Sequence, residues 1–266
     1  MSVGKMIAVS GPPGSGKTTL TLKLAQEVHE KTKKKVVYLS PDTLIPALGT
    51  IFPKRDKLSL LSLGVALENV NLAITDILGV IATTKAMPNM GYLGYIPGDG
   101  PYSYVALSEK KVLQMFQLMR DNFDYIFIDC DRERGNLIST IGCGLCDHLI
   151  QIINPDIKSI AYYGFEDIPD RAIQVLNLLD NDIYLPIQDT RTHFPNIQFA
   201  ILYSRMVKMQ MFNGELMDLL KDPIYRKAIK PIAELITAEP EEQSNEEQPT
   251  EEADPLAIEQ DDAFWA

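Results

Sequence analysis

The chain has 266 residues, 45% of them hydrophobic, which is enough for one domain with a substantial core and argues against a second large domain. The formal charge of −11 is concentrated near the end, because residues 239 to 262 hold eleven of the 36 acidic residues and no Lys or Arg. The other 25 acidic residues balance the 25 basic ones, which argues against a uniformly basic nucleic-acid-binding face.

The first nine residues lack the long apolar segment of a secretory signal, and no uninterrupted apolar stretch of about 18 residues follows. We therefore expect no integral membrane segment and a cytoplasmic location. The cysteines Cys130, Cys143 and Cys146 are too few for a disulfide framework, which fits a reducing compartment.

The most specific motif follows the apolar run 6 to 9, which predicts a strand over 6 to 10 and is followed by a predicted helix from 18 to about 30. Between them lies a complete G-x-x-x-x-G-K-[ST] string: Gly11, Pro12, Pro13, Gly14, Ser15, Gly16, Lys17 and Thr18. In such a loop the backbone N–H groups surround a phosphate, Lys17 reaches the β and γ oxygens, and Thr18 offers a hydroxyl to Mg²⁺. The sequence thus predicts nucleoside triphosphate binding by residues 11 to 19, Thr19 included.

Helical and strand patterns alternate along the rest of the chain. We predict strands over 36 to 40, 92 to 96, 125 to 129, 149 to 153 and 199 to 203, a mostly helical stretch over 43 to 90, helices over 108 to 121, about 168 to 180, 211 to 221 and 223 to 236, and an irregular segment with short strands over 182 to 195. The continuous apolar runs indicate strands covered on both faces. The expected fold class is α/β: a doubly wound, mostly parallel sheet with helices on both faces.

Beyond Thr237 the composition changes to Glu, Gln, Pro, Ser and Asp. We expect one domain over 1 to 237 and a disordered acidic tail over 238 to 266. The terminal pair Phe264 and Trp265 is either a frayed end or a short docking peptide.

Carboxylates follow two of the predicted strands. Asp129 ends the apolar run 125 to 128, where a carboxylate can hold Mg²⁺, and Asp131 is a second candidate. Asp42 follows the strand 36 to 40 and either approaches the γ-phosphate and its attacking water or caps a helix.

The order of these features resembles the ParA/MinD family of P-loop ATPases, which includes plasmid-partition, division-site and pilus-assembly ATPases. The likeness covers about residues 3 to 237. It rests on the loop, on the segments 36 to 42, 92 to 98 and 125 to 129, on Cys146 to Asp156, and on Phe199 to Arg205.

The resemblance implies a role for each matched position. Asp42 would orient the hydrolytic water, and Asp129 would support Mg²⁺ together with Thr18. Lys17, Asp42 and Asp129 would then form the catalytic set. Asn154 and the pair Ser204-Arg205 would approach the purine.

The chain departs from the family pattern at two positions. The family has a lysine at the second loop position that reaches the partner's phosphates across a dimer, and Pro12 stands there instead. A nucleotide-dependent homodimer would need another cation, for which Arg132 and Arg134 are the nearest candidates. Ser40 replaces a position that is acidic in many relatives, so hydrolysis is expected to be slow or stimulated by a protein partner.

Several alternatives stay open. Cys143 and Cys146 have a spacing that serves either a metal at a dimer interface or simple packing. The chain as a whole is either an ATP-hydrolysing regulatory switch, a small-molecule or nucleotide kinase, or a non-hydrolysing nucleotide-binding scaffold. A GTPase is disfavoured because no Asn/Thr-Lys-x-Asp string occurs.

Overall fold

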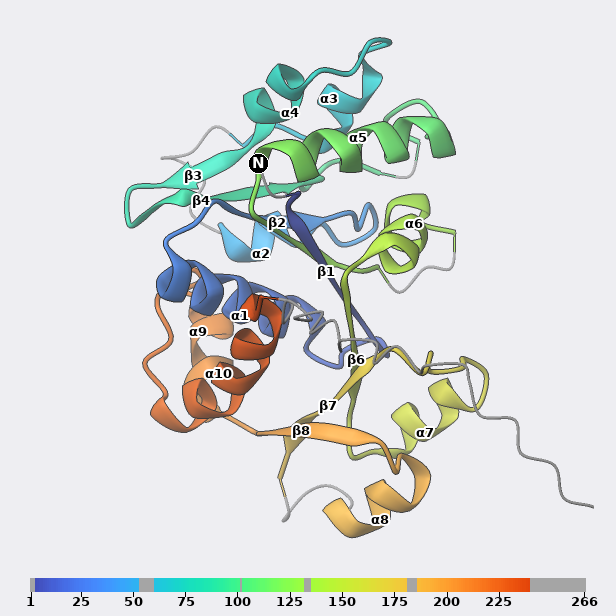
Figure 1. Cartoon of the computed structure of the whole chain (residues 1–266), viewed down its shortest axis with the longest axis vertical. Coiled ribbons are helices and arrows are strands. Elements are labelled where there is room, and N and C mark those ends of the chain that lie inside the picture. The colour runs from blue at the N-terminus through green and yellow to red at the C-terminus, as the bar shows by residue number, and fades with distance from the viewer. Residues whose placement is uncertain (1–2, 53–59, 101, 132–134, 181–185, 240–266) are drawn as a thin grey trace, which may run out of the picture.

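The computed structural model of the chain describes residues 3–52, 60–100, 102–131, 135–180 and 186–239 (Figure 1). In chain order the elements are β1 (Lys5–Ser10), α1 (Lys17–Thr32), β2 (Val36–Ser40), α2 (Leu48–Ile51), α3 (Leu63–Glu68), α4 (Ile74–Val80), β3 (Ala82–Thr84), β4 (Met87–Gly94), α5 (Glu109–Asn122), β5 (Tyr125–Asp129), α6 (Leu137–Leu145), β6 (His148–Ile153), α7 (Ile157–Tyr163), β7 (Ile173–Leu179), α8 (Ile187–His193), β8 (Ile197–Leu202), α9 (Arg205–Asn213) and α10 (Pro223–Thr237).

The described strands form one eight-stranded sheet in the order β3-β4-β2-β5-β1-β6-β7-β8. All neighbours pair in parallel except β3 and β4. β1 lies in the middle, where Ala8 pairs with Ile128 of β5 on one side and Leu149 of β6 on the other. The carboxyl ends of β1, β2, β5 and β6 therefore meet at one edge of the sheet, the usual place for a ligand in this fold class.

Helices cover both faces of the sheet (Figure 1). Side chains of α1, α2 and α10 pack with alternate strand residues such as Val36 and Tyr38, and those of α3 to α6 pack with Val37 and Leu39 on the other face. A smaller cluster joins α7 and α8 to β6 and β7. Because successive side chains of a strand point to opposite faces, a strand buried on both faces is apolar at every position. The predicted doubly wound α/β fold is confirmed.

Two predicted helices are wrong. Residues 173–179, predicted within a helix over 168–180, form the buried strand β7, because a short apolar run has no periodicity that separates strand from helix. The helix predicted over 211–221 lies earlier, as α9, and ends where Gly214 takes a left-handed conformation, φ 67°. The following residues form a loop that reaches α10.

Other boundaries differ less. The stretch predicted as mostly helical over 43–90 contains three short helices and then the β3–β4 hairpin, so β4 begins earlier than the predicted strand 92–96. Within the irregular segment 182–195 the described residues form α8. The predicted core strand 199–203 corresponds to β8, which lies at the sheet edge and exposes residues such as Gln198 and Ala200.

No described helix is long and apolar enough to span a bilayer. Of the predicted tail over 238–266, only residues 238 and 239 lie within the described part, so the domain boundary stays a prediction.

Candidate functional site

The predicted phosphate loop connects β1 to α1 at the carboxyl edge of the sheet. Gly14 and Gly16 have φ angles of 76° and 91°, which side-chain-bearing residues rarely adopt. A Cβ atom on Gly16 would also lie 2.7 Å from Nδ2 of Asn177. The glycines thus serve both the curl of the loop and its packing against β7.

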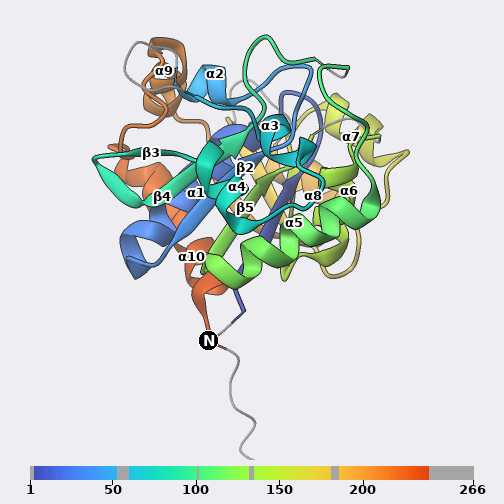
Figure 2. The same ribbon diagram turned by 90° about the horizontal axis from the view of Figure 1, so that it is seen from above.

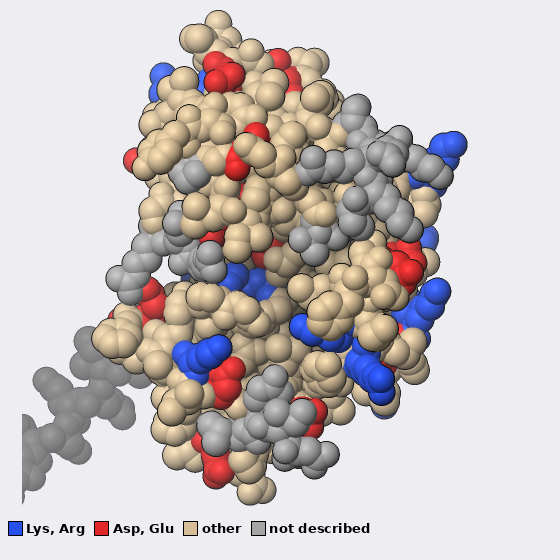
Figure 3. Space-filling model, turned by 180° about the vertical axis from the view of Figure 1, so that it is seen from behind, with Lys and Arg blue, Asp and Glu red and all other residues tan. Residues whose placement is uncertain are grey.

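The loop presents its residues to a cavity of about 410 Å³. Of the predicted nucleotide contacts, those that line it are Pro13, Gly14, Gly16, Lys17, Thr18 and Thr19. Gly11, Pro12 and Ser15 are buried behind them. The molecule is hollowed across the middle of the face in Figure 3, where basic side chains are visible inside the hollow.

Lys17 folds back over the loop. Its Nζ donates to the carbonyl oxygens of Gly11 at 2.9 Å and Pro12 at 3.0 Å. These two bonds place the ammonium group at the mouth of the loop, and an anion is a stronger partner for it than a carbonyl oxygen.

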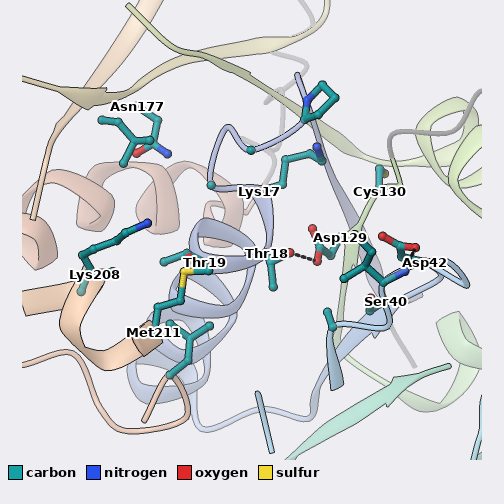
Figure 4. Close-up of a pocket in the computed structure, with 18 of the residues that line it drawn as sticks. Lys17, Thr18, Thr19, Ser40, Asp42, Asp129, Cys130, Asn177, Lys208 and Met211 are labelled. Atoms are coloured by element: carbon teal, nitrogen blue, oxygen red, sulfur yellow. Dashed lines mark hydrogen bonds between the residues drawn. The ribbon is translucent and has the colours of Figure 1, made fainter. Parts of the chain in front are cut away.

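Asp129 ends β5 beside the loop, and only 5% of it is exposed. Its Oδ2 accepts a hydrogen bond from Thr18 Oγ1 at 2.7 Å (Figure 4). The same oxygen accepts a second hydrogen bond from Tyr38 OH at 2.8 Å. Burial raises the pKa of Asp129 to about 6, although both hydrogen bonds and the charge of Lys17 act in the opposite direction. A buried carboxylate next to a threonine hydroxyl is a set of hard oxygen donors that suits Mg²⁺.

Asp42 lines the same cavity, as does Ser40 at the end of β2. Oδ1 of Asp42 accepts hydrogen bonds from the N–H groups of Leu44 and Ile45, each at 2.8 Å. This fixes the turn after β2, but the next helix, α2, begins only at Leu48, so the helix-cap alternative is not what the structure shows. Asp131 also lines the cavity.

The opposite side of the cavity, which we call the C-terminal wall, comes from later elements. Figure 4 shows Asn177, Lys208 and Met211 across the loop from Asp42 and Asp129. The full wall consists of Asn177, Leu178, Tyr203, Ser204, Val207, Lys208, Met211, Leu216 and Tyr225. Most of these residues were missed by sequence reasoning, because they lie on β7 and α9 or in the loop that was predicted as a helix.

Of the three residues predicted to approach the purine, Ser204 belongs to the C-terminal wall, whereas Asn154 and Arg205 do not line the cavity. Asn154 lies beneath the loop, where its Nδ2 donates to the carbonyls of Ser15 at 3.4 Å and Asn177 at 3.2 Å, and it does not line the cavity. Arg205 begins α9 but faces a neighbouring groove, while the preceding Ser204 lines the cavity. Contact of Asn154 or Arg205 with a base stays a prediction. Arg132 and Arg134 lie outside the described residues.

The C-terminal wall contains a backbone outlier. Leu178 has φ 60° at an irregularity in the pairing of β7 with β8. This left-handed conformation is costly for a residue with a Cβ and is common at functional sites. As a result both Asn177 and Leu178 line the cavity, although neighbouring residues of a regular strand point to opposite faces.

Side chains of helix α1 form hydrogen bonds with the loop that follows α9 and so support the C-terminal wall. Lys23, which is 1% exposed, donates from Nζ to the carbonyls of Leu216 at 2.8 Å and Asp218 at 2.7 Å. Gln26 Nε2 donates to the carbonyl of Met217 at 3.0 Å. Burial lowers the pKa of Lys23 to about 8, against the opposing charge of Asp218. The helix that begins with the phosphate loop thus also fixes the loop 214–222.

Within a single chain the described residues contain no group of three or more His, Cys, Asp or Glu side chains suited to a metal. A cysteine site shared between two chains stays a prediction. Sγ of Cys146 instead donates to the carbonyl of Cys143 at 3.2 Å.

Solved structures with the same fold include the cell division protein MinD of Aquifex aeolicus, with a TM-score of 0.67 and 18% identity over 89% of this chain and 98% of that one. The septum site-determining protein MinD of Pyrococcus horikoshii, complexed with Mg-ADP, gives 0.65 and 18% over 88% and 96%. A ParA family ATPase of Chlorobium tepidum gives 0.65 and 14% over 86% and 98%. No protein-family model and no curated protein sequence matches the chain. The predicted ParA/MinD resemblance is confirmed at the level of the fold.

Proposed function

We propose that this chain is a Mg-ATP-binding and ATP-hydrolysing switch of the ParA/MinD kind. One observation carries the proposal: residues of α1 (Lys17 and Thr18), the end of β5 (Asp129) and the segment after β2 (Asp42) meet at a single cavity at the carboxyl edge of the sheet. The shared fold with MinD, one example of which was solved with Mg-ADP, supports the same assignment.

Each residue has a distinct role in this proposal. The loop N–H groups and the α1 N-terminus bind the phosphates, and Lys17 moves from the loop carbonyls to the β and γ oxygens. Thr18 and Asp129 hold Mg²⁺, which when bound would neutralise charge on the β- and γ-phosphates. Asp42 orients water toward the γ-phosphate.

The C-terminal wall is proposed to receive the nucleoside. Asn177 is 2% exposed, and its Nδ2 donates to the carbonyl of Ser15 at 2.8 Å. Among the described residues its Oδ1 has no hydrogen-bond partner. This amide ties the phosphate loop to the wall, so the nucleoside would contact the more exposed wall residues Tyr203 and Met211.

The switch part of the proposal concerns a change of assembly. We propose that ATP favours a homodimer or a complex with a protein partner in the cytoplasm, and that turnover reverses it. Pro12 cannot supply the cross-dimer cation, so the proposal requires another one. Slow or partner-stimulated hydrolysis is expected.

The test is light scattering coupled to size-exclusion chromatography on Asp42→Ala without nucleotide, with Mg-ADP and with Mg-ATP. Asp42→Ala should retain ATP binding and lose turnover, so an ATP-specific dimer should accumulate. The control is Asp167→Ala, which changes an exposed aspartate outside the cavity lining. A monomer under all three conditions contradicts the dimeric switch, and transfer of phosphate to a small acceptor would favour a kinase.

A further inference from the structure

Two cysteines that are distant in the sequence meet behind the proposed Mg²⁺ ligand. Cys130 directly follows Asp129, is 2% exposed and is a lining residue of the cavity. Its N–H donates to the carbonyl of Val9 at 3.0 Å, which fixes it beside β1. Cys143 lies in the last turn of α6 and is half-buried. Their Sγ atoms are 3.4 Å apart, and both thiols are free.

The surroundings differentiate the two thiols. The hydrogen bond with Cys130 lowers the pKa of Cys143, and this effect exceeds the opposing effect of burial. Arg171 lowers it further, since its guanidinium lies at the end of α6, where it donates to the carbonyls of Cys143 and Cys146. Cys143 is thus the more exposed of the two thiols and the one whose pKa is lowered, and Cys130 is a buried thiol 3.4 Å away. A low-pKa, accessible cysteine next to a resolving cysteine is the arrangement found in redox-sensitive pairs.

We propose that Cys130 and Cys143 form a reversible intramolecular disulfide in the presence of a peroxide. The Cys143 thiolate attacks the peroxide O–O bond, giving a sulfenic acid and, after protonation, water or an alcohol. Sγ of Cys130 then attacks the Cys143 sulfur, the S–O bond breaks, and hydroxide leaves with the thiol proton as water. The two thiols lose two electrons and the peroxide gains them.

The bond would act on the cavity through the segment after β5. It would shorten the Sγ–Sγ distance from 3.4 Å to about 2.05 Å and join the end of β5 to α6. The N–H of Asp131 already donates to Ser139 Oγ of α6 at 2.8 Å, and Asn136 Nδ2 donates to the carbonyl of Pro41 at 2.8 Å, next to Asp42. Drawing Cys130 toward α6 would displace Asp129 from Thr18. This consequence rests on the proposed function, whereas the disulfide itself does not.

The test compares the full-length protein reduced and after treatment with a small excess of hydrogen peroxide, followed by alkylation and peptide mapping without reductant. A Cys130–Cys143 cross-linked peptide, lost on addition of dithiothreitol, is expected in the wild type and in Cys146→Ser. It should be absent from Cys143→Ser and from Cys143→Ala. Two substitutions are used so that the test still stands if one of them fails to fold. A Cys143–Cys146 bond, an intermolecular disulfide or no disulfide would overturn the proposal.

Affinity for a fluorescent ATP analogue in the presence of Mg²⁺ is measured on the same samples. Oxidation should weaken it by about threefold or more in the wild type and Cys146→Ser, with recovery on reduction. An unchanged affinity in protein shown to carry the disulfide would overturn the regulatory consequence. If reduced protein does not bind the analogue but the disulfide still forms, the proposed function fails and the redox pair stands.

Discussion

The two sides of the cavity are built in different ways. The phosphate side comes mainly from eight consecutive residues, Gly11 to Thr18, whose fold is fixed locally by glycine conformations and by bonds such as Ser15 N–H to the Pro12 carbonyl at 3.2 Å. The C-terminal wall is assembled from β7, α9, α10 and two connecting segments. Phosphate binding is therefore encoded locally, whereas the shape that surrounds the rest of the ligand depends on long-range packing.

Helix α1 connects the two sides. Its first turn carries Lys17 and Thr18, and its next turns carry Lys23 and Gln26, which hold the loop 214–222. We therefore expect variants on the phosphate side to lower Mg-ATP affinity more than variants that disturb the C-terminal wall.

The largest expected effect is on the phosphate side. Lys17→Ala removes the cation proposed to meet the β and γ oxygens, so affinity for Mg-ATP should fall by about 100-fold or more. Isothermal titration calorimetry measures it, and unchanged circular dichroism shows that the fold is kept. Tight ATP binding by this variant would refute the assignment of the loop.

Asp129→Asn should change stability and nucleotide binding in opposite directions. The pKa of Asp129 is raised to about 6, so between pH 4 and 6 the folded state binds more protons than the unfolded state. The free energy of unfolding therefore falls as the pH rises through this range. At pH 7 the buried charge is fully present, so the neutral amide should raise the free energy of unfolding of the nucleotide-free protein by about 2 kcal/mol.

Urea unfolding at several pH values, without Mg²⁺, measures this effect. The difference between Asp129→Asn and the wild type should vanish below about pH 4, where the carboxyl is protonated in both states. A lower stability of the variant at pH 7 would contradict the argument. Mg²⁺-dependent nucleotide affinity should decrease in the same variant.

Lys23→Met tests the link between the two sides. It leaves the carbonyls of Leu216 and Asp218 without their donor, so the wall should lose order and Mg-ATP affinity should fall by about 1 kcal/mol, or about fivefold. Lys31→Met, on an exposed position of the same helix, is the matched control. Equal affinities of the two variants would show that the wall does not depend on α1.

The smallest effect concerns Leu178. Glycine adopts φ 60° without strain, which offsets the lost side-chain contacts, so Leu178→Gly should change the free energy of unfolding by less than about 1 kcal/mol. Leu179→Gly, at the neighbouring buried position, should cost about 3 kcal/mol. Thermal or urea denaturation compares them, and equal losses would show that the left-handed conformation of Leu178 carries no strain.

The phosphate side of the cavity could be predicted from the sequence, whereas most of the C-terminal wall could not. The phosphate loop, the central strands and the placement of Asp129 at a strand end all rest on contiguous patterns, and the structure places them at one sheet edge. Apart from Ser204, the C-terminal wall was not predicted, because the apolar run of β7 lacks a distinguishing period and the end of α9 depends on Gly214. The Cys130–Cys143 contact was missed for a related reason: the spacing to Cys146 is visible in the sequence, whereas the contact requires α6 to pack beside β5.

The C-terminal end of α10 lies at the end of β1 that is opposite the phosphate loop. Lys5, the first residue of β1, donates from Nζ to the carbonyls of Ile236 at 3.1 Å and Ala238 at 2.6 Å, and Figure 2 shows this end of α10 beside the N-terminus. The phosphate loop leaves the other end of β1, six residues or about 20 Å away. Protein attached to a sensor surface directly at Ala238 or Glu239 would therefore present its cavity to the flowing solution.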